Sequence, residues 1–96
     1  MDKFVMKYSD DSVYMEAGTV EELAKALKTC PIGCVSFHLR GGLNDFGEWV
    51  GKAAGDAGLA AKLKQVKLSE SNPESTRKAL LELLEPKSIF KIRKKR

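Results

Sequence analysis

The sequence has no run of apolar residues that approaches the ~20 needed for a helix to cross a bilayer. Its start also lacks an apolar stretch followed by small residues, the pattern of a secretory signal. These absences predict a cytoplasmic protein that does not insert into a membrane. A chain of 96 residues is enough for one domain with one modest core.

Motifs for phosphate binding and nucleophilic catalysis are missing as well. The glycine-rich stretch GGLNDFG, residues 41–47, fits neither GxxxxGK[ST] nor GxGxxG. No Ser or Cys lies in a strand-to-helix elbow of the kind that presents a nucleophile. An anion at a helix N-terminus here is an alternative, although Asp45 would repel it. We therefore expect no cofactor and no catalytic constellation.

Cysteine is scarce, with Cys30 and Cys34 in the segment CPIGC and a single histidine in the chain. A disulfide is disfavoured in a reducing compartment. Zinc normally takes four protein ligands, or three and a water, and two Cys with one His do not supply such a set convincingly. We favour the alternative of two small buried apolar side chains around a turn, and we expect no metal site.

The first half of the sequence predicts a hairpin followed by a helix. Residues 3–8 alternate in polarity, residues 9–12 are typical of a turn, and residues 13–17 form a second short strand. Thr19 and Glu22 have the spacing of a capping box, in which the Thr19 side chain accepts from the Glu22 amide and the Glu22 carboxylate reaches the Thr19 amide. Pro31 and Gly33 should end this helix.

Residues 34–39 alternate again and predict a third strand, with Val35, Phe37 and Leu39 on one face. Three helices should follow, beginning at Asn44 or Asp45, at Asp56, and at Asn72-Pro73. Strands followed by helices indicate the α+β class. We expect one sheet of three or four strands, one helix across it, and a C-terminal helical half. The domain should span residues 1–86, followed by a basic segment, residues 87–96.

The last ten residues contain no acidic side chain and six basic ones, namely Lys87, Lys91, Arg93, Lys94, Lys95 and Arg96. Six of the 17 basic residues lie here, which leaves 11 basic against 13 acidic side chains in the first 86 residues. Clustered cations attract phosphate through counterion release. Because Ile89, Phe90 and Ile92 are interleaved, the segment could also form a fourth strand, stack Phe90 on a base, or contact an acidic protein or an anionic membrane. It could equally be a solubilising extension without a partner.

His38 and Asp45 form a candidate polar site. A histidine oriented by a carboxylate can act as a general base. The alternative is structural, with His38 bonded to the following loop or helix N-terminus. Trp49 follows Phe46 by three residues, and an aromatic pair at helical spacing is more typical of a core than of a base-stacking platform.

The leading interpretation is a small non-enzymatic binding module whose basic segment contacts RNA or the ribosome, or another anionic partner such as an acidic protein. A protein–protein adaptor that uses the helical half is the first alternative. An enzyme or sensor built on His38 and Asp45 is the second.

The spacing FHL-x(5)-DF-x(2)-W, followed by GD-x(2)-LA-x(2)-L, is similar to a family of small, uncharacterised archaeal and bacterial proteins. The likeness covers roughly residues 3–66 and continues more weakly through the last helix. It implies the same α+β fold and a cytoplasmic protein, and it supplies no activity. It also implies that a helix-capping Asp45 is bonded to a strand His38. The matching residues are Phe37, His38, Leu39, Asp45, Phe46, Trp49, Gly55, Asp56, Leu59, Ala60 and Leu63.

Overall fold

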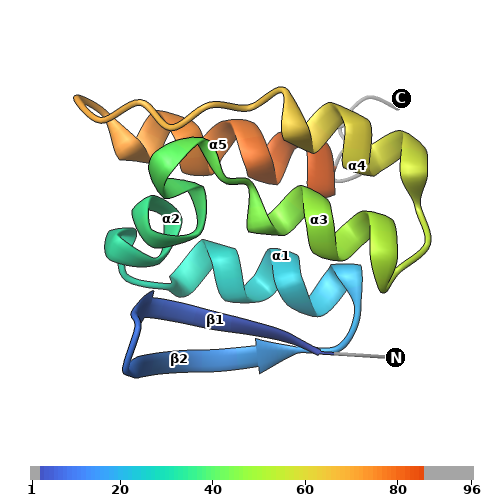
Figure 1. Ribbon diagram of the computed structural model, residues 1–96, viewed down its shortest axis with the longest axis horizontal. Coiled ribbons are helices and arrows are strands. Elements are labelled where there is room, and N and C mark those ends of the chain that lie inside the picture. The colour runs from blue at the N-terminus through green and yellow to red at the C-terminus, as the bar shows by residue number, and fades with distance from the viewer. Residues whose placement is uncertain (1–2, 86–96) are drawn as a thin grey trace, which may run out of the picture.

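The structure, a computed structural model, describes residues 3–85 (Figure 1). It confirms the α+β class, with one two-stranded antiparallel hairpin and five α-helices in the described range. The elements are β1 (Phe4–Ser9), β2 (Ser12–Ala17), α1 (Val20–Thr29), α2 (Ile32–Leu39), a 3₁₀ turn (Arg40–Gly42), α3 (Asp45–Lys52), α4 (Ala57–Lys64) and α5 (Pro73–Leu84).

The predicted hairpin is confirmed, and it lies against the helices on one side of the molecule. Phe4 pairs with Ala17 at its open end, and Phe4 and Met6 are both buried. In Figure 1 the hairpin is at the bottom, α1 lies above it, and α4 and α5 are at the top. Helix α1 packs against β2 and α5, whereas α2 packs against β1 and α5.

The predicted third strand is wrong, because residues 34–39 belong to helix α2. The buried positions are Cys34 and Val35, then His38 and Leu39, which is one helical face rather than an alternation. Helix α2 contacts β1, α3 and α5 and is apolar over most of its surface, so it carries little amphipathic periodicity. The sheet therefore has two strands among residues 3–85, and the predicted fourth strand lies outside the described residues.

Helix α1 ends before Pro31, as predicted, but a second helix begins directly after it, and Gly33 lies inside that helix. Thr29 is the last residue of α1, and Pro31 is the N-cap of α2. A proline is well tolerated at a helix start, where its missing amide has no intrahelical partner. Pro31 thus separates two helices, whereas the sequence predicted a break between a helix and a strand.

Side-chain caps fix the starts of the other helices. Thr19 accepts from the Glu22 amide at 3.0 Å, as predicted, but the Glu22 carboxylate accepts from the Gly18 amide rather than from Thr19. Helix α3 begins with Asn44 as its cap, and Asp45 is the first helical residue, so Asp45 is not the capping residue. Asp56 and Asn72 cap α4 and α5, as predicted.

The core is organised around aromatic side chains from the hairpin and α3. Phe46 is fully buried and Trp49 is 9% exposed, which confirms the prediction that this pair belongs to the core. The Phe4 ring lies 5.2 Å from that of Phe46 and 6.0 Å from that of Trp49. Among residues 3–85, no helix combines the length and the apolar character that a membrane crossing needs.

Two leucines offer a matched test of this packing. Leu80 of α5 is fully buried, whereas Leu43 is 50% exposed. We expect Leu80→Ala to lower the free energy of unfolding by about 2–5 kcal/mol, because it leaves a cavity in the core. Leu43→Ala should change it by about 0.5 kcal/mol or less. Urea unfolding of both variants measures the difference, and equal losses would contradict this arrangement of the core.

Candidate functional site

The turn between α2 and α3 brings the two predicted polar residues together. His38 lies in the last turn of α2, and Asp45 is the first residue of α3. Gly41 and Gly42 connect the helices with φ angles of +63° and +83°. Residues other than glycine rarely adopt such φ angles. These two glycines therefore permit the sharp turn of the backbone that places Asp45 beside His38.

Both ring nitrogens of His38 are hydrogen-bonded within the protein. The backbone amide of Lys7 in β1 donates to Nε2 at 2.9 Å, and Nδ1 lies 2.9 Å from Asp45 Oδ2. An amide can donate only to an unprotonated ring nitrogen. Nδ1 therefore carries the proton and donates it to the Asp45 carboxylate, and the imidazole is neutral.

The surroundings of His38 favour this neutral form. Its side chain is 5% exposed, against 38% for that of Asp45. Rings of Phe4, Phe37 and Phe46 lie 4.8–5.4 Å from the imidazole. Burial lowers the pKa of His38 from 6.5, and the opposing effect of Asp45 does not cancel it.

This geometry gives His38 a joining role between three elements. A general base needs a free lone pair within reach of a substrate proton, and Nε2 already accepts from the Lys7 amide. The same two hydrogen bonds connect α2 to β1 and to the start of α3. The contact of His38 with Asp45 is present as expected, but it is made from a helix rather than from a strand.

Beside Asp45 the surface forms two adjoining hollows of about 250 and 340 Å³, which share Gly42, Leu43, Asn44 and Lys64. Several polar groups along them are engaged internally. The Asn44 side chain accepts from the Gly47 amide and donates to the Leu63 carbonyl at 2.7 Å. Lys64 and Lys52 pair with Glu48 and lower the pKa of its carboxyl.

The two cysteines are free and buried, which confirms the interpretation of CPIGC as apolar packing. Burial raises the pKa of both thiols, to about 12 for Cys34. A thiol in such surroundings stays protonated at neutral pH and is a poor nucleophile and metal ligand. No group of three or more His, Cys, Asp or Glu side chains suited to a metal lies within residues 3–85.

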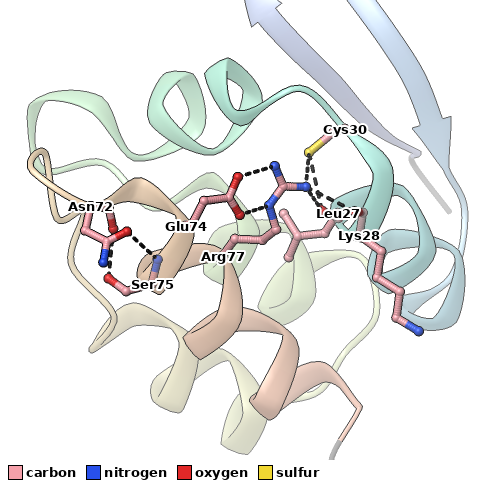
Figure 2. A network of polar contacts seen from close by, with 7 residues as sticks. All are labelled: Leu27, Lys28, Cys30, Asn72, Glu74, Ser75 and Arg77. Carbon is pink, nitrogen blue, oxygen red and sulfur yellow. Dashed lines mark hydrogen bonds and ion pairs between the residues drawn. The ribbon is translucent and has the colours of Figure 1, made fainter.

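Sequence reasoning missed a second polar network, which is centred on Arg77 of α5 (Figure 2). Its Nη1 donates to the backbone carbonyls of Leu27 at 2.8 Å and Lys28 at 3.1 Å, and its Nε lies 3.0 Å from Glu74 Oε1. These carbonyls belong to the last turn of α1 and have no partner inside the helix. The Glu74–Arg77 spacing is visible in the sequence, but the contact with α1, some 50 positions away, is not.

The predicted anion-binding residues Lys87, Lys91, Arg93, Lys94, Lys95 and Arg96 lie outside the described residues. Within the described range, several cations are paired with carboxylates. Lys28 lies 3.0 Å from Glu85, Lys64 lies 3.4 Å from Glu48, and Arg77 contacts Glu74. By count, the net positive charge of the chain comes from residues 87–96, because the first 86 residues hold more acidic than basic side chains.

The lowered pKa of His38 predicts a pH-dependent stability. Between pH 7.5 and 6.5 the free energy of unfolding should change little. Below pH 6.5 it should fall by up to about 1.4 kcal/mol per pH unit, because the unfolded chain then binds a proton that the folded chain does not. Urea unfolding from pH 7.5 to 5.5 measures this, and His38→Gln should remove the dependence in that window.

NMR gives a second readout that does not depend on a variant, since the chain has one histidine. ¹⁵N shifts should show a proton on Nδ1, and the titration midpoint should lie below 6.5. A midpoint at or above 6.5, or a proton on Nε2, would contradict the geometry described.

No match to this chain is found among curated proteins or solved structures. One family model does match, the one described as a family of unknown function (DUF5752), and it covers residues 4–94. The match spans the hairpin, all five described helices and most of the basic segment. The chain thus belongs to this family of unknown function.

Proposed function

We propose that this protein is a small non-enzymatic binding module of the cytoplasm, and that residues 87–96 contact RNA, in the first place that of the ribosome. The separation of charge along the chain carries this proposal. The last ten residues hold six cations and no acid, while the first 86 residues hold more acidic than basic side chains. A cluster of cations binds a phosphate backbone through counterion release, with little dependence on its sequence.

Ion pairs made by Lys and Arg side chains within residues 3–85 support the proposal. Lys28, Lys64 and Arg77 each lie within 4 Å of a carboxylate. A cation already paired with a carboxylate contributes less to the attraction of a further anion. The described domain thus offers less positive potential than its count of basic residues suggests, and residues 87–96 carry most of the attraction.

The state of His38 also supports a binding role rather than an enzymatic one. An enzyme or sensor built on His38 and Asp45 needs an imidazole that a substrate or a proton can reach. The ring is 5% exposed and uses both nitrogens to join β1, α2 and α3. A structural role for His38, in which it joins these three elements, accounts for both of its hydrogen bonds.

Binding of this kind has a distinct physical signature. Each phosphate neutralised by Lys or Arg releases condensed counterions, so the affinity falls as the salt concentration rises and depends little on sequence.

We expect the full chain to bind single-stranded RNA with an affinity that depends steeply on salt. If all six cations contact phosphates, a plot of log K against log salt concentration should have a slope of about −4. Lys94→Gln with Lys95→Gln should reduce this slope by about 1.4 and weaken binding to all RNA sequences alike. Fluorescence anisotropy across a salt series measures both quantities.

A matched double variant controls for net charge. Lys25→Gln with Lys78→Gln removes the same two charges from exposed positions on α1 and α5, and it should leave the slope nearly unchanged. RNA binding that is weakened equally by the two double variants, or that persists without residues 87–96, would contradict the proposal.

A further inference from the structure

The described chain ends on the wall of an apolar groove. The groove lies between α4 and α5 and has a volume of about 430 Å³. Leu59 of α4 and Leu83 and Leu84 of α5 form its apolar wall, and Leu59 and Leu83 are each only partly buried. Leu59 and Leu83 each keep part of their surface exposed in the groove, where a further apolar segment can pack on them.

Charged residues surround this apolar wall. Asp56 and Glu82 stand at the edge of the groove, together with Lys62. The Asp56 side chain accepts from the Leu59 amide as the cap of α4. The groove thus presents leucines with a surplus of one carboxylate, a combination that suits a segment with apolar and basic residues.

Such a segment follows within the same chain. Helix α5 ends at Leu84, and 11 more residues follow Glu85, beginning with Pro86. They include Ile89, Phe90 and Ile92, interleaved with lysine and arginine. An extended chain spans about 3.3 Å per residue, so residues 89–92 can reach a groove whose wall contains Leu83 and Leu84.

The family match supports the same occupant. It runs through residue 94, ten positions beyond the end of α5. The family unit therefore includes the segment that follows α5 and does not stop at the last described helix. Because the family model includes both the described domain and this segment, we expect the segment to pack on the domain.

We propose that residues 88–92 of the same chain dock into the α4–α5 groove, with Phe90 and one or both isoleucines against Leu59, Leu83 and Leu84. Lys91 faces Asp56 or Glu82 at the rim. Docking holds the start of the basic segment against the domain and leaves residues 93–96 outside the groove. This inference concerns the fold of the chain and stands whether or not the basic residues bind RNA.

NMR of the full chain tests the proposal, with leucine and isoleucine methyl groups labelled. We expect nuclear Overhauser contacts between the Phe90 ring and the methyl groups of Leu59 and Leu83. Amide hydrogens in residues 88–92 should exchange at least tenfold more slowly than in an unstructured peptide of the same sequence. Both signals should be independent of protein concentration, because the contact is within one chain.

Two double variants separate docking from charge. Phe90→Ser with Ile92→Ser should remove the slow exchange and shift the methyl signals of Leu59 and Leu83, while those of Leu43, outside the groove, stay unchanged. Lys94→Ser with Lys95→Ser should leave all of these signals as in the original chain. The first variant keeps all six basic residues, so RNA binding can be scored separately from docking.

Three outcomes would overturn the proposal. The first is an absence of contacts from Phe90 to the groove together with unprotected amides in residues 88–92. The second is a set of contacts that appears only at high concentration along with a dimer, which would place the segment on a second copy. The third is a groove whose methyl signals do not respond to Phe90→Ser with Ile92→Ser, which would leave it open to a separate protein, as an adaptor role requires.

Discussion

The two hydrogen bonds of His38 hold the centre of this fold together. Helix α2 is short, and its N-terminus has no side-chain cap, so its position depends on contacts with its neighbours. His38 supplies two of them, one with the Lys7 amide of β1 and one with Asp45 at the start of α3. The hairpin, α2 and α3 thereby share one buried polar side chain, which sits among aromatic rings.

A buried imidazole is stable in this place only while both nitrogens keep their partners, because an unsatisfied buried polar atom costs about 1–3 kcal/mol. The Lys7 amide donates to Nε2, so the imidazole proton is on Nδ1, where it is donated in a hydrogen bond to Asp45. Asp45 is 38% exposed and remains in contact with water. The pair thus spans the boundary between core and surface. The contact also depends on the turn at Gly41 and Gly42, whose positive φ angles bring Asp45 close to His38.

Much of this fold follows from local signals, and its main error comes from a segment that lacks them. The caps Thr19, Asp56 and Asn72 mark helix starts because each side chain meets an amide only a few residues away. Residues 32–39 are covered by neighbours on several sides, so their apolar pattern has no period that separates a helix from a strand. The signature spacing predicted the meeting of His38 with Asp45, but the Lys7 amide and the carbonyls bound by Arg77 are long-range backbone partners that no side-chain pattern reveals.

The described helices, the basic segment and the family match have different boundaries along the chain. The described helices end at Leu84, the basic residues begin at Lys87, and the family match continues to residue 94. By sequence, residues 87–96 combine three large apolar residues with six basic ones. The two proposals use different members of this segment, because docking relies on the apolar residues and anion binding relies on the basic ones, so the two are compatible.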